Sequence, residues 1–271
     1  MSDGIFMIRG GFFGFDWTLK LIYLIGGLIL CIYDWKKNNR KDYFLVYLFG
    51  ASLYIGSEVM LFLFGGRVMQ DKLLFGMNIT SMPWLWIPIM AIADVVVLGV
   101  IALFFADRIR NPETRRRWIY YFVIWLLLRD VLPYVFLYIS GSSFASVPIG
   151  DPLIYSRRNM IETGTIIALS IIIITTLFWF FRADKESKKR GLYMVAVMVT
   201  MMTVWSCGEW LAGQRWIEAG PENGPWSLAT PLQSIGMFAY DIVIEMGLFT
   251  LSFLALPSLF KLIKPRMQGV G

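Results

Sequence analysis

Histidine is absent from this 271-residue sequence, and only two cysteines, Cys31 and Cys207, are present. Histidine is the commonest metal ligand and the usual acid–base group near neutral pH. Its absence argues against histidine-ligated haem and histidine-rich di-metal chemistry, so we expect no metal site. The topology predicted below puts the two cysteines near opposite faces of a membrane, which excludes a disulfide between them.

Charged residues are also scarce. They make up 16% of the chain, whereas 57% of the residues are hydrophobic and the mean hydropathy is +0.62. A soluble domain has about 25% charged residues. So much apolar surface cannot be hidden in one aqueous core, and we expect the lipid bilayer to be the solvent. Residues 1–16 lack the pattern of a signal peptide, so the first helix is expected to insert directly.

The net charge of +6 does not indicate binding to nucleic acid, because the basic residues are distributed in short clusters between apolar segments. These clusters fall within residues 36–41, 108–117, 182–190 and 261–266. Basic loops of membrane proteins remain in the cytoplasm. The alternation therefore predicts an N-terminus outside and a C-terminus in the cytoplasm, most simply in the plasma membrane.

Seven segments are apolar and long enough to cross about 30 Å of hydrocarbon, which needs about 20 residues. They lie near residues 17–35, 43–64, 84–106, 118–140, 160–181, 191–213 and 233–260. The predicted fold class is an all-α membrane protein, a single domain over residues 1–271 built as a bundle of seven transmembrane helices.

An internal repeat is suggested by two similar stretches. The chain reads MAIADVVVLGVIAL around Asp94 and MFAYDIVIEMGLFTL around Asp241. Both lie on helices that run in the same direction, four helices apart. This spacing is consistent with two helix triplets joined by the fourth helix, a 3+1+3 arrangement.

Ionisable residues inside the predicted helices are the strongest functional signal, because each is costly in a bilayer unless it is paired or hydrated. The predicted proton or ion network comprises Glu58, Asp94, Arg129, Asp130, Glu209, Asp241 and Glu245. Lys20 is expected to extend towards the headgroups. For Glu162 and Glu209 a structural role, as a cross-helix hydrogen bond or a headgroup contact, is an equal alternative.

Asp241 and Glu245 are four residues apart and so share one face of the seventh helix. Two carboxylates this close in a low dielectric are expected to share a proton. Arg129 is the only basic residue predicted near the middle of the membrane. Arg129 is therefore the natural partner for one acid, and beside this pair it would ionise one of the two carboxylates.

Several helices resemble those of the microbial rhodopsins. The third contains Thr80-Ser-Met-Pro83-Trp84-Leu85-Trp86-Ile87-Pro88, the sixth Trp205-Ser-Cys-Gly-Glu209-Trp210, and the seventh Asp241-Ile-Val-Ile-Glu245-Met-Gly247. The resemblance implies a rhodopsin-like bundle. It also implies an apolar ligand pocket lined by Trp84, Trp86, Pro88, Trp205 and Trp210, although core packing explains these aromatic residues equally well.

The departures from that family concern its chemistry. Glu245 stands where the family has the lysine that binds retinal, and a carboxylate cannot form an imine with an aldehyde. Pro83 and Thr80 replace the family's counterion aspartate and its arginine. We therefore expect no covalent cofactor, while a non-covalent retinoid, carotenoid or lipid stays open.

Three functions fit these observations. The first is proton or cation translocation or sensing through the intramembrane carboxylates. The second is a cofactor-free cyclase or isomerase that protonates an isoprenoid or carotenoid and stabilises the carbocation with aromatic faces. The third is a structural or regulatory partner of another membrane protein, or of a second copy of this chain. Enzymatic activity is the less favoured interpretation.

Overall fold

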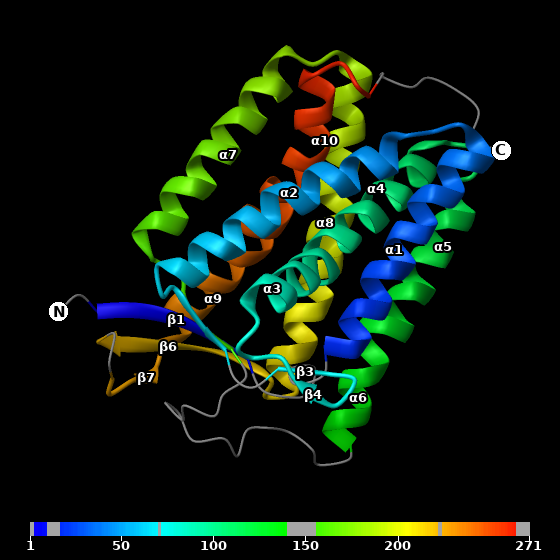
Figure 1. Ribbon diagram of the computed structural model, residues 1–271. Helices are drawn as coiled ribbons and strands as arrows, with labels where there is room; N and C mark the ends of the chain where they lie inside the picture. Colours follow the sequence, from blue (N-terminus) through cyan, green and yellow to red (C-terminus); the bar gives the residue numbers. More distant parts are fainter. Residues whose placement is uncertain (1–2, 10–16, 70–71, 140–155, 222–223, 264–271) are drawn as a thin grey trace.

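The computed structural model describes residues 3–9, 17–69, 72–139, 156–221 and 224–263 (Figure 1). It confirms the prediction of seven helices that are long and apolar enough to cross a membrane. They span Trp17–Asn38, Asp42–Leu63, Pro83–Arg110, Arg115–Ile139, Thr163–Arg182, Lys185–Leu211 and Pro231–Leu259.

Four of the seven are continuous α-helices: α1 (Trp17–Asn38), α2 (Asp42–Leu63), α7 (Thr163–Arg182) and α8 (Lys185–Leu211). The other three contain a π-helical segment. The third runs as α3 (Pro83–Ala91), η2 (Ile92–Val96) and α4 (Val97–Arg110). The fourth is α5 (Arg115–Leu126), η3 (Leu127–Val131) and α6 (Leu132–Ile139). The seventh is α9 (Pro231–Ala239), η5 (Tyr240–Leu248) and α10 (Phe249–Leu259).

A five-stranded antiparallel sheet lies across one end of the helices, at the bottom of Figure 1, and we call this the sheet end. Its order is β2 (Arg67–Met69), β5 (Ser156–Asn159), β1 (Asp3–Arg9), β6 (Arg215–Pro221) and β7 (Ser227–Leu228). A separate hairpin joins β3 (Leu73–Leu74) to β4 (Met77–Asn78). The sequence prediction of an all-α protein was therefore incomplete, because it treated these segments as loops.

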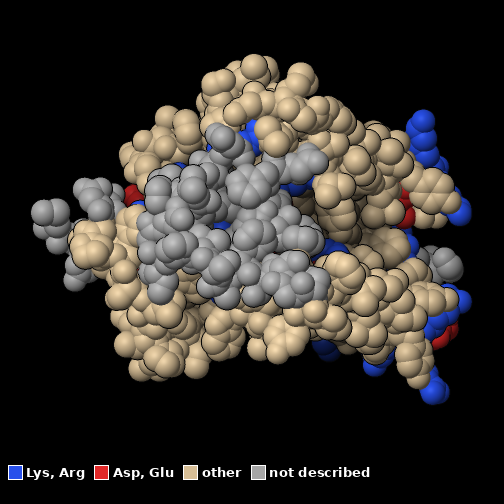
Figure 2. All heavy atoms as spheres, turned by 90° about the horizontal axis from the view of Figure 1, so that it is seen from below, with Lys and Arg blue, Asp and Glu red and all other residues tan. Residues whose placement is uncertain are grey.

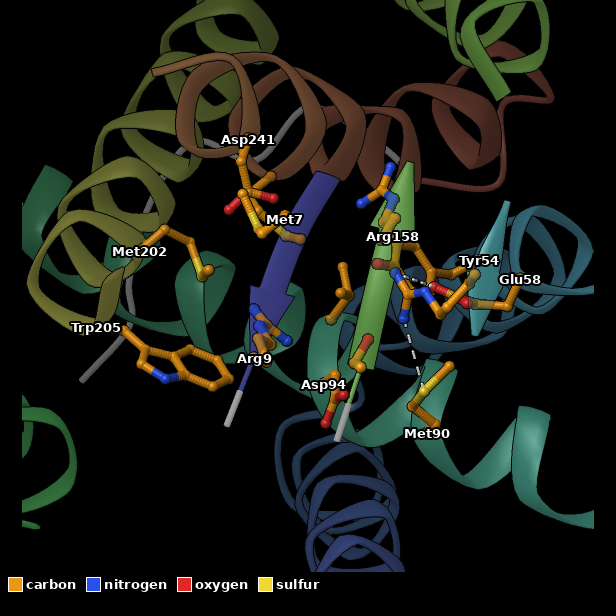
Figure 3. Close-up of a pocket in the computed structure, with 14 residues that line it drawn as sticks. Met7, Arg9, Tyr54, Glu58, Met90, Asp94, Arg158, Met202, Trp205 and Asp241 are labelled. Atoms are coloured by element: carbon orange, nitrogen blue, oxygen red, sulfur yellow. Dashed lines mark hydrogen bonds and ion pairs between the residues drawn. The ribbon is translucent and has the colours of Figure 1, made fainter. Parts of the chain in front are cut away.

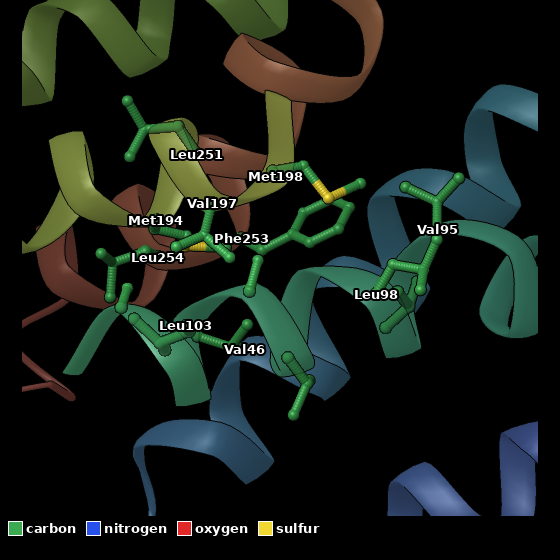
Figure 4. Close-up of a cluster of buried hydrophobic side chains, with 14 of the residues drawn as sticks. Val46, Val95, Leu98, Leu103, Met194, Val197, Met198, Leu251, Phe253 and Leu254 are labelled. Atoms are coloured by element: carbon green, nitrogen blue, oxygen red, sulfur yellow. The ribbon is translucent and has the colours of Figure 1, made fainter. Parts of the chain in front are cut away.

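The main apolar core lies where α4, α8 and α10 meet (Figure 4). Leu98, Met198 and Phe253 are fully buried in it. Gly50 of α2 faces the same core, where a Cβ atom would lie 2.9 Å from the Phe253 ring, so this close approach requires a glycine. By contrast, only 11% of the apolar window of α7 is buried. This is the pattern of a helix whose outer face meets lipid.

The opposite end, which carries the predicted basic clusters, is held by its own buried ion pairs. Arg190 of α8 contacts Asp107 of α4 at 2.6 Å and Asp42 of α2 at 2.8 Å. Arg40, in the turn between α1 and α2, pairs with Asp34 of α1 at 2.7 Å. We call this end of the helices, opposite the sheet, the basic end. In Figure 2, seen from below Figure 1, lysine and arginine side chains gather at one edge, whereas most of the visible described surface is uncharged.

Side-chain caps fix the starts of three helices, α7, α8 and α9, the last through Thr230. The carboxylate of Glu162 accepts hydrogen bonds from the backbone N–H groups of Gly164 at 2.7 Å and Thr165 at 2.6 Å, at the start of α7. Asp184 caps α8 in the same way. Such caps satisfy N–H groups that the helix itself leaves unpaired. Glu162 thus has a structural role as the cap of its own helix, instead of the cross-helix hydrogen bond or headgroup contact considered from the sequence.

Candidate functional site

Four arginines on one face of the sheet point at the ends of the helices. Arg67 and Arg158 are directly opposite each other on β2 and β5, and Arg9 is opposite Arg215 on β1 and β6. Successive side chains of a strand alternate between its two faces. The register therefore gathers these four side chains on the inner face. Like charges directly opposite each other are destabilising, so each arginine pair requires anionic neighbours.

Arg215 is the centre of one half of this arrangement. Its side chain is fully buried and contacts Glu209 of α8 at 2.6 Å and Asp241 of η5 at 3.0 Å. It also donates a hydrogen bond to the hydroxyl of Ser206 at 2.7 Å. Arg9 lies 3.8 Å from the same Glu209 carboxylate. One strand residue thus ties two transmembrane helices to the sheet.

Arg158 and Arg67 form the other half. Arg158 donates two hydrogen bonds to Glu245 of η5, at 2.7 and 2.5 Å, which is the bidentate geometry of a strong arginine–carboxylate pair. Burial opposes the charged form of Arg158, but Glu245, Tyr54 and Glu58 together outweigh this effect and raise the pKa of Arg158 above its usual value. Arg67 contacts Glu58 of α2 at 3.3 Å.

The fifth carboxylate, Asp94 of η2, pairs with Lys20 of α1 at 2.5 Å. The expectation that Lys20 extends towards the headgroups was therefore wrong. An ammonium group inside the bundle gains more from a direct carboxylate partner than from reaching along a long stem to the interface.

The network is balanced in charge. Its cations are Arg9, Lys20, Arg67, Arg158 and Arg215, and its anions are Glu58, Asp94, Glu209, Asp241 and Glu245. Burying a charge is costly unless it is paired and hydrogen-bonded. Each of these carboxylates contacts at least one cation, so the balance explains how ten ionisable groups are accommodated at this end of the bundle.

Two small cavities lie within the network, each of about 30 Å³. The first lies beneath the sheet, and Figure 3 shows Arg9, Arg158, Glu58, Asp94 and Asp241 around it. The second lies between α2 and α7, where Glu245 and Leu169 are among its walls. Glu58, Tyr54 and Arg158 line both cavities. A water molecule needs about 10–15 Å³ by this measure, so each cavity has room for two or three waters.

Each of the three π-helical segments contains intramembrane ionisable residues. Asp94 lies in η2, Arg129 and Asp130 lie in η3, and Asp241 and Glu245 lie in η5. A π-helical segment inside an α-helix is rare and occurs frequently at functional sites. Each of the two stretches on which the predicted repeat rests contains a π-helical segment, while the repeat itself stays a prediction.

Arg129 does not lie beside Asp241 and Glu245, and that prediction was wrong. Arg129 pairs with its neighbour Asp130 at 3.1 Å. Its guanidinium also lies 4.8 Å from the ring centres of both Trp125 and Trp205. The positions next to Asp241 and Glu245 are taken by Arg215 and Arg158, so the two acids have separate basic partners.

In the described part of the chain, the five residues of the predicted aromatic pocket do not gather around one cavity. Trp84 is 73% exposed and Trp210 is 52% exposed, so both lie on the outer surface of the helices. Trp86 is buried in a small core where Trp17 donates a hydrogen bond to its carbonyl oxygen, and Pro88 is a half-buried residue inside α3. Of the five residues, Trp205 alone lines either of the two cavities. Neither cavity has room for a retinoid or carotenoid.

The sequence reasoning missed the arginines of the sheet. Six basic residues occur in the loops predicted to lie outside, where the positive-inside rule does not expect them: Arg9, Arg67, Lys72, Arg157, Arg158 and Arg215. Four of the six belong to the network. Basic residues on the unexpected side of the membrane were the available signal for a segment that faces buried acids.

The described residues contain no group of three or more cysteine, aspartate or glutamate side chains placed to hold a metal ion. No protein-family model, curated protein or solved structure matches this chain. The relation to microbial rhodopsins therefore stays a prediction. What the geometry provides is a buried, neutral network of carboxylates and guanidinium groups between a sheet and a membrane-spanning bundle.

Proposed function

We propose that this integral membrane protein senses protons through the network at its sheet end. The observation that carries the proposal is the placement of the acids: they lie on membrane-spanning helices distant in sequence, three of them on π-helical segments, and each is held by a cation, mostly from the sheet. Protonating one carboxylate removes one ion pair between the sheet and the helices. A proton would thus change how firmly the sheet is held.

Glu58 is the carboxylate that we expect to take up the proton. Its contact with Arg67 is 3.3 Å, whereas the other four acids each have a cation at 3.0 Å or closer. It also lines both cavities, so a water molecule in either one would reach it. The released Arg67 lies in β2, at the edge of the sheet, where a strand is paired on one side only.

Sensing is favoured over translocation because the network is confined to one end. Asp94 and Asp107 lie 13 residues apart on the third membrane-spanning helix, which is about 20 Å at 1.5 Å per residue. Between these two acids, η2 and α4 contribute buried apolar residues such as Val95, Leu98 and Leu103 to the main core (Figure 4). This packed layer separates the sheet end from the ion pairs of the basic end.

Acid catalysis on an isoprenoid or carotenoid is a weaker candidate, because it needs a pocket that holds the chain and the two cavities hold only a few waters. A structural role beside another membrane protein or a second copy stays an alternative. For the orientation, we keep the basic end in the cytoplasm, as the clusters of lysine and arginine indicate. The sheet would then meet the outside medium and report its pH.

Infrared difference spectra of the reconstituted protein test the proposal. On going from mildly basic to mildly acidic pH, we expect a band of a protonated carboxyl group that Glu58→Gln lacks. The matched control is Glu113→Gln, which removes an exposed acid at the basic end and should keep the band. A spectrum without this band, or one that Glu58→Gln leaves unchanged, contradicts proton uptake at Glu58.

A flux assay on the same vesicles separates sensing from translocation. With a pH-sensitive dye inside vesicles and an imposed pH gradient, proton entry should equal that of empty vesicles. Proton entry above this background that disappears in Glu58→Gln would show that the network conducts, and the sensing proposal would be wrong.

A further inference from the structure

Two arginines that line the cavity beneath the sheet have a guanidinium N–H group without a protein acceptor. The Nε atoms of Arg67 and Arg158 are buried and have no hydrogen-bond partner among the described residues. Arg67 and Arg158 line this cavity, and Arg158 is only 8% exposed. A guanidinium has donors and no acceptor, so whatever satisfies these groups must present lone pairs. The site is therefore built to receive an acceptor.

The size of the cavity limits that acceptor. Its volume of about 30 Å³ corresponds to two or three waters or to one monatomic anion. A sulfate ion or a lipid phosphate group is too large to be enclosed there. A halide-sized ion is the charged species that fits both the volume and the donors.

The charge balance decides when an anion can enter. The charged residues that line the cavity are Arg9, Arg67, Arg158, Glu58, Asp94 and Asp241, which sum to zero when all are ionised. An anion added to this neutral, buried site would lose its hydration without a compensating charge. One proton on a carboxylate leaves an excess positive charge, and the anion then gains a Coulomb attraction in low dielectric.

We infer that this cavity binds one halide-sized anion together with one proton on Glu58. The groups that face Glu58 include Arg67 of β2, Arg158 of β5 and Arg9 of β1, Asp94 of η2, Asp241 and Glu245 of η5, and Tyr54 of its own helix. Of these, Arg67 is its direct partner, and it is the residue that would turn from the carboxylate to the anion. The inference rests on the proposed proton uptake, and it adds the ligand that would respond to it.

Binding linkage gives a quantitative expectation. If one proton accompanies one anion, the anion affinity should rise about tenfold for each pH unit of acidification above the apparent pKa of the site. Bromide is the probe. Thermal unfolding of the purified protein in sodium bromide, compared with sodium gluconate at equal ionic strength, should show stabilisation at mildly acidic pH that fades towards basic pH.

Variants test the site itself. Glu58→Gln mimics the protonated acid, so it should bind bromide at basic pH with no remaining pH dependence. The double variant Glu58→Gln/Arg67→Gln removes a donor without leaving a charge unpaired and should lose bromide binding. The control Asp130→Asn/Arg129→Gln removes an ion pair outside the cavity and should bind as the unmodified protein does.

Anomalous diffraction from crystals grown in bromide at mildly acidic pH should give a peak between Arg67 and Arg158. A water molecule at that position with no bromide peak, or stabilisation by bromide that survives in Glu58→Gln/Arg67→Gln, would overturn the inference. The proposed function fails separately, on the infrared band measured without halide. A protein that shows the band and binds no bromide would be a proton sensor without an anion site.

Discussion

Removing Arg215 should test whether the sheet holds the bundle through charge. Arg215→Met keeps an apolar stem of similar length but leaves two buried carboxylates behind. Glu209 keeps only the distant Arg9 at 3.8 Å, and Asp241 keeps no other ion-pair partner among the described residues. Breaking one side of a buried pair costs about 3–5 kcal/mol, because a buried charge is left uncompensated. We expect a loss of that size in the free energy of unfolding at neutral pH.

The loss should depend on pH in a defined direction. A buried carboxylate without a partner favours its neutral form, so acidification relieves the variant by protonating Asp241 or Glu209. The stability of Arg215→Met should therefore approach that of the unmodified protein as the pH falls. The double variant Arg215→Met/Asp241→Asn removes the unpaired Asp241 charge by substitution instead of by protonation. It should recover about 0.5–3 kcal/mol of the lost stability at neutral pH.

The measurement is denaturant-induced unfolding in mixed micelles, followed by tryptophan fluorescence at several pH values. Arg182→Met is the control, because Arg182 is an exposed arginine at the end of α7 that contacts the Phe178 ring, and its loss should stay within about 0.5 kcal/mol. If Arg215→Met unfolds like this control, or if its loss does not change with pH, the network does not hold the sheet to the helices by charge.

Two further predictions concern other parts of the chain. Glu162→Ala should lower the free energy of unfolding by about 0.5–2 kcal/mol at neutral pH, because it removes the cap of α7. Burial favours the neutral form of Glu162, but hydrogen bonds from Thr165 and Gly164 lower the pKa of its carboxyl group in the folded protein. The stabilisation by the cap is therefore complete above the ordinary glutamate pKa of about 4.3, and it is lost as the pH falls through the pKa of the folded state. An acid titration of stability in which the variant and the unmodified protein run parallel would contradict this. The predicted orientation can be tested in a variant without the native cysteines. An impermeant maleimide added to intact cells should label Ser227→Cys and not Lys185→Cys. Labelling of both positions, or of Lys185→Cys alone, would contradict the predicted orientation.

The number and approximate limits of the helices could be predicted because the bilayer imposes a local rule. A run of about 20 apolar residues that forms a helix satisfies all its backbone N–H and C=O groups within the segment, so it can cross the bilayer whatever lies next to it. The predicted segment 43–64 and the observed α2, Asp42–Leu63, differ by one residue at each end. The intramembrane acids were identified for the same reason, since a charge in an apolar run is visible in the sequence. Asp94, Glu58, Asp241 and Glu245 all line the cavities of the structure.

Which cation meets which acid was decided only by the tertiary structure. Arg9, Arg67, Arg158 and Arg215 are spread over more than 200 residues and become neighbours through strand pairing between segments distant in sequence. Short strands have weak local signals, and their register is set by the whole sheet rather than by any one segment. The prediction that Arg129 pairs with Asp241 or Glu245 was wrong because a similar depth in the membrane does not fix the direction in which a side chain leaves its helix. The amino-acid sequence thus determined where charge enters the membrane, and the sheet determined how that charge is neutralised.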